Sequence, residues 1–423
     1  MSVMGCGLKK ILQIAAWSAL PVLVSLSVFF LLKGTASSLF LFTESIAECL
    51  TAKAVPMVLA AVLGYIAGCC LILKKNPICY TGYLLLFAMM LMLHSNHFNQ
   101  DGLALEEKFE TAEVVHAVHD EMLELVLHFF VWRLFNLFTE CTAAASYHIV
   151  SAAAGVAFFH VLAGFTRKHI RNNQLLFLLL VTGSGYLQLF YGDVENYTIL
   201  AFSLMWYLTS SVNLIIEGGR SLLPSILLGI GMCLHLEAGF LLPAHILLSF
   251  LRFRKEPLHL LLSSAMPVIL TVICMTVLDL AGVLPMENLW KYSHASAHGG
   301  NIQSVLPPLS RAYYTEIANL TLLLFPLVSV LPLYLLSEKA LRKPDIQFLT
   351  SATGVLFLLL LGWKASLGVF NDWNLFAIIG YTGNLTVVYA YFKSCRPERK
   401  LAIPFLTCSL LNTFCWIWRN HAV

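Results

Sequence analysis

The sequence carries very little charge for its length. Asp, Glu, Lys and Arg make up 12% of its 423 residues, hydrophobic residues make up 59%, and the mean hydropathy is +0.79. A soluble fold cannot bury so much apolar surface. The composition therefore excludes an ordinary soluble protein and predicts an all-α protein that crosses a membrane many times.

Three further absences narrow the function. The 11 Cys residues form no CxxC pair, so a zinc ribbon or a disulfide framework is not indicated, and residues such as Cys274 are interpreted as small buried hydrophobes. The net charge is only +3 and no basic stripe interleaved with aromatics occurs, which excludes a nucleic-acid partner. No repeat, low-complexity linker or soluble domain is visible. Residues 1–423 are expected to form a single transmembrane domain.

Apolar runs of membrane length are what the sequence has in abundance. The run from Ile11 to Leu32 lacks a clear small-residue cleavage site and is interpreted as a retained first helix. Two short runs, 222–236 and 238–251, are expected to form a re-entrant or tightly broken pair, and 126–139 is expected to be buried or interfacial. About thirteen spans are predicted: 11–33, 56–73, 78–94, 143–165, 174–191, 197–216, 222–236, 238–251, 258–281, 315–336, 346–366, 374–393 and 400–418.

The distribution of charge predicts the orientation of these spans. With the N-terminus in the cytoplasm and alternating spans, 18 of the 26 Lys and Arg residues fall on the cytoplasmic side. Of the 23 Asp and Glu residues, 18 fall on or near the other side. The polar clusters that resemble a reactive site are therefore expected on the non-cytoplasmic face, in a loop at 95–125 with one or two short interfacial helices and a second loop at 282–314.

Asp101, in the sequence Gln-Asp-Gly, follows the third predicted span. A carboxylate beside glycine in a loop at the membrane edge can face a lipid headgroup, either as a general base or as a metal ligand. The alternative is an ordinary solvated acid.

The rest of the 95–125 loop contains further candidates. His116, His119 and Asp120 share a helix face at this spacing, so they are the candidate ligands of a divalent metal such as Mg²⁺ or Mn²⁺, or else polar anchors at the interface. Glu121 and Glu124 enter an apolar helix, where an acid is costly to place, and are favoured over the acids that precede them.

Two more polar groups interrupt apolar sequence. Asp193 and Glu195 stand in FYGDVENY at the bilayer edge, where they serve either a ligand or the dipole of the following helix. His235 and Glu237 interrupt LLGIGMCLHLEAGFLLP and form the clearest intramembrane polar pair, which is either functional or a mutual buried hydrogen bond.

Three cations, Arg133, Arg311 and Lys364, fall on the side that the positive-inside tendency disfavours. A lipid phosphate or pyrophosphate would explain them, because guanidinium and ammonium groups match phosphate oxygens. Snorkelling or an internal salt bridge would explain them equally well.

The order of these motifs resembles that of bacterial multispanning glycosyltransferases of the GT-C type. The likeness covers roughly residues 95–380 and rests on the Asp-Gly loop, FYGDVENY, His235, the segment Glu316-Ile-Ala-Asn and the segment NDWNLF at 371–376. That group is expected to carry Gly-Asp-Gly, an aromatic residue in place of Asp193 and a late Asp-Trp-Asp-Leu-Phe. Here Gln100 replaces the first Gly, and Asn374 replaces the second Asp of the late motif, which removes a carboxyl group. Asp101 also follows the third span instead of the first.

The resemblance implies a GT-C-like fold and an inverting transferase that moves a sugar from a polyprenyl-phosphate donor to a hydroxyl of a lipid, glycan or protein acceptor. It also implies a bacterial inner membrane with the site on the periplasmic face. Asp101 would deprotonate the acceptor, and the three cations, with or without a divalent metal, would stabilise the departing phosphate. The residues expected to line the substrate site are Glu121, Arg133, Asp193, Glu195, His235, Glu237, His298, Arg311, Glu316, Lys364, Asp372 and Trp373.

Two rival functions fit the same composition. A transporter or flippase of a lipid-linked sugar would also carry intramembrane acids and broken helices, but it should place polar groups near mid-membrane and on both faces. A non-catalytic membrane scaffold with a decayed site is the second rival, which the Asn374 replacement favours.

Overall fold

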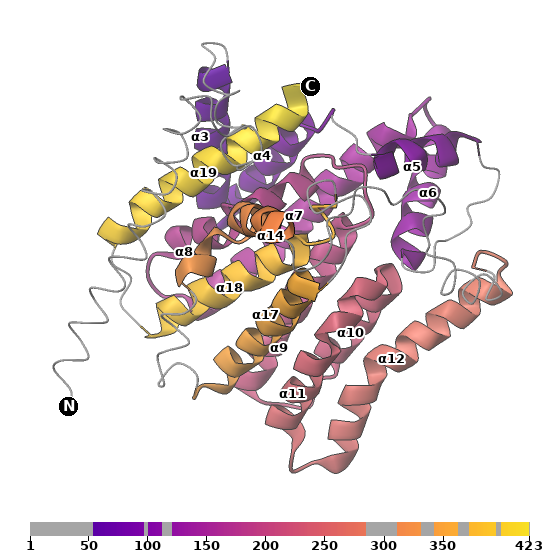
Figure 1. Cartoon of the computed structure of the whole chain (residues 1–423), viewed down its shortest axis with the longest axis vertical. Coiled ribbons are helices and arrows are strands. Elements are labelled where there is room, and N and C mark those ends of the chain that lie inside the picture. The colour runs from indigo at the N-terminus through magenta and orange to yellow at the C-terminus, as the bar shows by residue number, and fades with distance from the viewer. Residues whose placement is uncertain are drawn as a thin grey trace.

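The computed structural model describes residues 54–96, 100–111, 121–284, 311–330, 342–362, 372–394 and 399–422. Every regular element in these ranges is a helix (Figure 1). In chain order the elements are α3 (Ala54–Ile72), α4 (Ile78–Met92), α5 (Gln100–Thr111), α6 (Met122–Asn136), α7 (Ala143–His169), α8 (Gln174–Thr182), η1 (Gly185–Phe190), α9 (Thr198–Glu217), α10 (Leu223–Leu234), η2 (Leu236–Leu241), α11 (Leu242–Phe253), α12 (Pro257–Leu280), α14 (Arg311–Leu324), η3 (Pro326–Val330), α17 (Pro344–Gly362), α18 (Ala377–Ser394) and α19 (Arg399–Ala422).

Long apolar helices confirm that the chain is an integral, multi-pass membrane protein, but they do not support thirteen spans. Six stretches of the described residues are long and apolar enough to cross a membrane: Ala54–Ile72, Ala143–His169, Thr198–Glu217, Leu236–Phe253, Pro257–Leu280 and Pro344–Gly362. Two shorter apolar helices, Ile78–Met92 and Leu223–Leu234, accompany them. Of the other predicted spans, 11–33 lies outside the described residues, 78–94 and 222–236 form short helices, and 174–191 is broken into α8 and η1.

The breaks have local causes. α8 has nine residues and ends at Gly183, and the 3₁₀ turn η1 follows it. α10 has twelve residues and ends at His235, whose extended backbone (φ −151°, ψ 128°) cannot continue a helix. At about 1.5 Å per residue, α10 rises only about 18 Å, short of the ~30 Å hydrocarbon core. The expected broken pair at 222–251 is therefore present as α10, η2 and α11.

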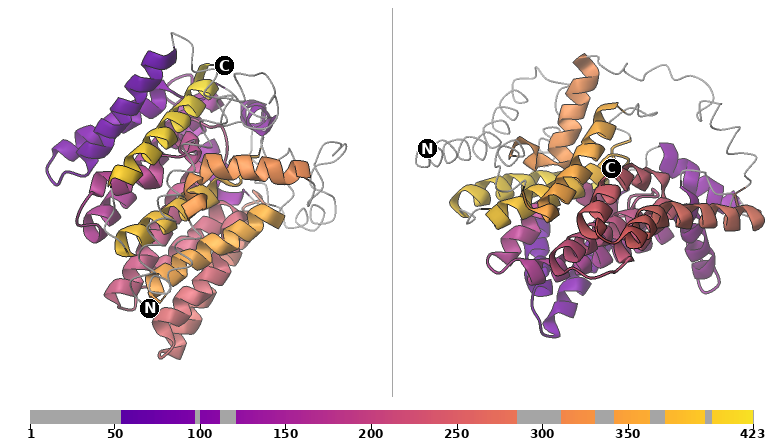
Figure 2. Two further views of the ribbon diagram at one scale, coloured as in Figure 1. Left: turned by 60° about the vertical axis from the view of Figure 1, so that its left-hand side comes forward. Right: turned by 90° about the horizontal axis from the view of Figure 1, so that it is seen from below.

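The helices form a layered bundle in which α3 and α4 lie on one flank and α11 and α12 on the opposite one (Figures 1 and 2). Helices α7, α9 and α18 lie between the flanks and contribute many fully buried aromatic side chains, among them Phe158, Tyr207 and Tyr381. α12 is the least buried of the candidate spans. Its outer face carries a row of exposed apolar residues, which suits contact with lipid.

Basic residues gather at one end of this bundle. Arg167 at the end of α7 donates a hydrogen bond to Ile72 O at the end of α3 (2.6 Å), and Lys168 forms an ion pair with Glu217 at the end of α9. On the neighbouring helices, Arg252 donates to Gly219 O. We refer to this side as the basic end; it corresponds to the cytoplasmic side of the sequence prediction.

The opposite side, the acidic end, is where α6, the 191–197 segment and the C-terminus meet. Ser95 N donates to Tyr191 O (2.7 Å), and Asn96 N donates to Asn420 O (2.9 Å). α5 and α6 close this end through an apolar cluster in which Phe109, Phe129 and Trp132 pack around Tyr147 and Val194. Residues 100–111, expected in a freely turning loop with interfacial helices, form the helix α5, so Asp101 lies in a first helical turn, where Asp is favoured by the helix dipole.

Candidate functional site

The segment 191–197, which joins η1 to α9, is buried along almost its whole length. Gly192 lies in the left-handed region at φ +75°, and a Cβ added there would lie 2.7 Å from the Cδ2 atom of His148. The His148 ring packs on the His94 ring at a centroid distance of 4.4 Å. Glycine is therefore needed at this position both for its backbone conformation and because the His148 ring and the Cβ atom of His94 leave no room for a side chain.

Glu124 of α6 ties the start of α9 in place. Its carboxyl oxygens accept hydrogen bonds from Ile199 N (2.7 Å) and Leu200 N (3.0 Å), and the side chain is fully buried. Tyr197 immediately before α9 provides no side-chain cap, so a distant residue satisfies N–H groups that the helix itself leaves unpaired. A carboxyl group at a helix N-terminus also complements the helix dipole. Glu124 is thus part of the framework of the site.

A chain of polar contacts extends from this point. The Tyr147 hydroxyl donates to Asn196 Oδ1 (2.9 Å), and the Asn196 amide donates to Glu121 Oε2 (2.9 Å). The His128 ring stacks on the Tyr147 ring at 3.9 Å with an interplanar angle of 10°. The carboxyl groups of Glu121, Glu124 and Glu195 all lie within electrostatic reach of the Tyr147 hydroxyl. Three acids from two separate segments therefore converge on one tyrosine.

The two motifs that carry the family resemblance meet although they are far apart in the sequence. Asp193, from FYGDVENY, lies beside the side chain of Asn374, from NDWNLF. Both side chains are buried, and Asn374 Nδ2 and Asp193 Oδ2 have no hydrogen-bond partner among the described residues. Burial raises the pKa of Asp193 to about 7, because removal from water disfavours its charged form, and the interaction with Asn374 acts in the opposite direction. A carboxyl group with such a pKa exchanges protons near neutral pH.

His235 and Glu237 lie at the break between α10 and α11. The Nδ1 atom of His235 accepts a hydrogen bond from Glu237 N (3.1 Å), and its ring packs on that of Tyr197 at 4.9 Å. The Glu237 carboxyl is 5% exposed, and neither of its oxygens has a hydrogen-bond partner among the residues that the structure describes. The Tyr381 hydroxyl lies within electrostatic reach of both Glu237 and Glu124, which links this break to the α6 acids.

We refer to Glu121, Glu124, Asp193, Glu195, His235 and Glu237, with their neighbours Tyr147, Asn196, Asn374 and Tyr381, as the acidic cluster. Of the side chains expected at a substrate site, five belong to this network: Glu121, Asp193, Glu195, His235 and Glu237. Asp372 and Trp373 directly precede Asn374 in the sequence. The side chains of Asp372 and Trp373 are both buried, and the Trp373 ring packs edge-on against Trp416 at 6.1 Å.

The other candidates are not part of the cluster in the described structure. Arg133 is exposed, with its guanidinium 5.2 Å from the ring centroids of Phe129 and Trp132. Glu316 is half-buried on α14. The side chains of Asp101 and Arg311 lie outside the described part of the chain, as do the whole residues His116, His119, Asp120, His298 and Lys364. In the ranges that the structure describes, no group of three His, Cys, Asp or Glu side chains could hold a metal ion.

Sequence reasoning missed the framework of the cluster. His128 follows Glu124 by one helical turn, a spacing that brings two side chains together and was visible in the sequence. Tyr147 and Tyr381 carried no such signal, because each one meets its acids only through the tertiary fold. Asn374 was noted only as a replacement within NDWNLF, and its position beside Asp193 was not predicted.

Comparisons with known proteins identify no family for this chain. No protein-family model matches it, and neither a curated protein nor a solved structure is significantly similar to it.

Proposed function

We propose that this protein is a membrane glycosyltransferase that moves a sugar from a polyprenyl-phosphate donor to an acceptor hydroxyl at the acidic end. The meeting of Asp193 with Asn374 is the observation that carries the proposal. It unites the two most specific motifs of the resemblance and surrounds them with buried acids. Isolated buried carboxyl groups are costly in a membrane protein, so their concentration at one end favours a functional role.

The proposed reaction is a single displacement. The acceptor oxygen loses its proton to a carboxylate and bonds to the anomeric carbon, while the bond from that carbon to the phosphate oxygen breaks and the lipid phosphate leaves. Because attack and departure occur on opposite faces, the configuration inverts. The departing phosphate is stabilised by Arg311, Lys364 or Arg133, with or without a divalent metal such as Mg²⁺ or Mn²⁺.

The acids differ in the hydrogen bonds that their carboxyl groups already accept. Glu124 is occupied by the N-terminus of α9, and Glu121 accepts from Asn196, so neither is a suitable base. Asp101 remains the proposed base. Asp193, with a pKa of about 7, is the second candidate, because a base works best when its pKa lies near the working pH. Glu237 and His235 are proposed to line the pocket that binds the sugar of the donor.

The test uses the full chain in lipid nanodiscs with a radiolabelled hexosyl or pentosyl decaprenyl phosphate as donor and a bacterial membrane extract as the source of acceptor hydroxyls, and it follows release of the lipid phosphate. Asp101→Asn and Asp193→Asn are compared with Glu110→Gln, an exposed acid on α5. Loss of the base should lower the rate by roughly 10²–10⁴-fold, and the control should keep wild-type turnover. Wild-type protein that releases no phosphate from any of these donors, or full turnover in both variants, would refute the proposal.

Lipid-linked sugar transport is kept as a second candidate by one observation, a groove with a charged mouth at the basic end that is described below. A transporter requires polar features on both faces. Movement of an intact labelled donor across a proteoliposome membrane, without cleavage of its phosphate bond, would decide for transport.

A further inference from the structure

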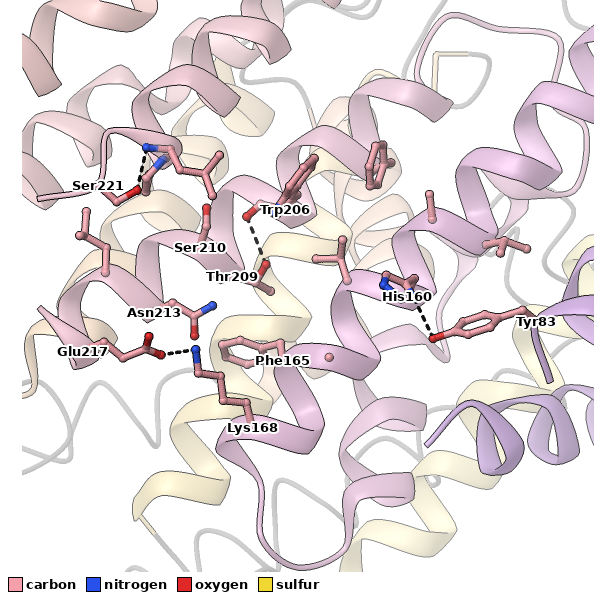
Figure 3. A pocket seen from close by; sticks show the side chains of 18 of the residues that line it. Tyr83, His160, Phe165, Lys168, Trp206, Thr209, Ser210, Asn213, Glu217 and Ser221 are labelled. Carbon is pink, nitrogen blue, oxygen red and sulfur yellow. Dashed lines mark hydrogen bonds and ion pairs between the residues drawn. The ribbon is translucent and has the colours of Figure 1, made fainter. Parts of the chain in front are cut away.

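A long groove lies on the outside of the bundle, away from the acidic cluster. Its volume is about 1000 Å³, and it is lined by α4, α7, α9 and the start of α10 (Figure 3). It follows α7 from Ala153 to Lys168 and α9 from Phe202 to Glu217. Fifteen residues of helix correspond to about 22 Å. The groove is thus longer than half of the ~30 Å hydrocarbon core and can hold a chain that crosses one leaflet.

The wall of this groove is effectively apolar. Its polar side chains are engaged with one another or with their own helix: His160 Nδ1 with Tyr83 OH (3.1 Å), Thr209 with Met205 O (2.8 Å), Ser210 with Tyr207 O (3.0 Å) and Asn213 with His169 Nε2 (2.6 Å). The remaining surface comes from residues such as Ala157, Phe165 and Trp206, and an added Cβ at Gly164 would meet no atom within 4 Å. Such a wall suits a hydrocarbon chain.

Among the residues that line the groove, one cation and one anion are present, and both lie at its mouth. Lys168 and Glu217 form an ion pair there, and their side chains are 47% and 50% exposed (Figure 3). An ion pair that is half exposed contributes little to stability. A ligand with its own cation and anion can therefore insert between the two side chains and replace the pair at small cost.

We propose that the groove binds a phosphatidylethanolamine molecule from the leaflet at the basic end. Its phosphate contacts the Lys168 ammonium, its own ammonium contacts the Glu217 carboxylate, and one acyl chain lies along Gly164 and Trp206. The headgroup matches the mouth because both are zwitterionic. An anionic headgroup would bring no cation of its own for the Glu217 carboxylate.

The choice of ethanolamine over choline follows from hydrogen bonding. A primary ammonium has three N–H donors for a carboxylate. The quaternary ammonium of choline has none and is recognised by several aromatic faces arranged as a cage. Five aromatic side chains line the groove, of which Phe165 lies about one turn from Lys168 on α7, and the one carboxylate in the lining is that of Glu217.

Native mass spectrometry of the full chain in mild detergent tests the proposed lipid preference of the groove. The probes are phosphatidylethanolamine, phosphatidylcholine and phosphatidylglycerol with identical acyl chains. We expect one tightly retained phosphatidylethanolamine, with apparent affinity about tenfold above the other two lipids. Gly164→Leu should fill the groove and abolish retention. Gly354→Leu is the matched control, since it is a helical glycine with the same open space on α17, away from the groove.

A second pair of variants tests the headgroup contacts. Glu217→Gln removes the partner of the ammonium and should erase the preference over phosphatidylglycerol. Glu256→Gln is its control, because Glu256 pairs with Arg220 at the same end but does not line the groove. Equal retention of the three lipids by wild-type protein, preference for phosphatidylglycerol, or undiminished retention by Gly164→Leu would overturn the proposal. These experiments measure retained lipid, so their outcome does not depend on whether the protein has transferase activity.

Discussion

Glu124 allows the sharpest test of how the site is held together. Replacing it with Ala removes the acceptors of Ile199 N and Leu200 N at the start of α9 and leaves both donors buried. Hydrogen bonds to charged groups contribute about 1.5–3 kcal/mol each, and the two share one carboxyl group, so we expect a loss of about 3–5 kcal/mol. Because His128 Nε2 lies only 3.9 Å from Glu124 Oε1, the change also removes a polar neighbour of that ring.

Glu124→Gln provides an intermediate case. One amide oxygen can still accept from a backbone N–H, whereas the amide nitrogen would face the second N–H as donor against donor. We expect about half of the loss seen for Glu124→Ala.

Thermal unfolding of the purified protein in detergent, followed by intrinsic tryptophan fluorescence, measures both variants. At about 2 °C per kcal/mol for a chain of this size, Glu124→Ala should lower the melting temperature by roughly 6–10 °C. Glu110→Ala, at an exposed position on α5, should change it by about 1 °C or less. A Glu124→Ala protein that melts with this control would refute the claim that α6 caps α9.

Three further predictions concern the segment at 191–197. Burial raises the pKa of Asp193 in the folded state to about 7, from an ordinary value near 3.8 in the unfolded chain. Its contribution to stability is therefore full below about pH 4 and is lost as the pH rises through 7, and Asp193→Asn should flatten the melting temperature between pH 5 and pH 8. Asn374→Asp places a second carboxyl group beside Asp193 and should destabilise the protein more at pH 8 than at pH 6, because two neighbouring carboxyl groups resist being ionised together. An equal loss of stability at both pH values would contradict the proximity of residues 193 and 374. Gly192→Ala combines left-handed backbone strain with a steric clash against His148 and should lower the free energy of unfolding by about 2–4 kcal/mol. Gly282→Ala, with φ +71° and open space, should lower it by only about 1–2 kcal/mol through strain alone. Equal melting temperatures of the two variants would show that the clash at Gly192 is relieved.

The run at 174–191 shows where reading the sequence alone went wrong. It is apolar enough to be taken as a span, but Gly183 ends a helix inside it, whereas the break at His235 between 222–236 and 238–251 was expected. Hydropathy reports how much apolar surface a segment offers and is insensitive to backbone breaks. Breaks are stabilised by distant partners, as when Ser409 donates to Gly183 O, and such partners cannot be read from local sequence.

The acidic cluster was predicted in part. Asp193, Glu195, His235 and Glu237 stood out because an ionisable side chain in apolar sequence needs a partner or a purpose. Sequence reasoning could not identify Asn374 as the neighbour of Asp193, nor could it distinguish Glu124 as a helix cap from a reactive acid. Both distinctions depend on which groups occupy the remaining hydrogen-bonding positions of each carboxyl.

By itself, the sequence determined the membrane environment, the helical class and the separation of basic from acidic residues along the chain, because these follow from composition and from the energetic cost of placing charge in hydrocarbon. Only the tertiary structure decided which acids are already satisfied, which ones face each other and where a lipid-sized groove opens. Those properties arise from contacts between helices that are distant in sequence, and hydrophobic patterning drives the helices together without specifying which polar side chains will meet.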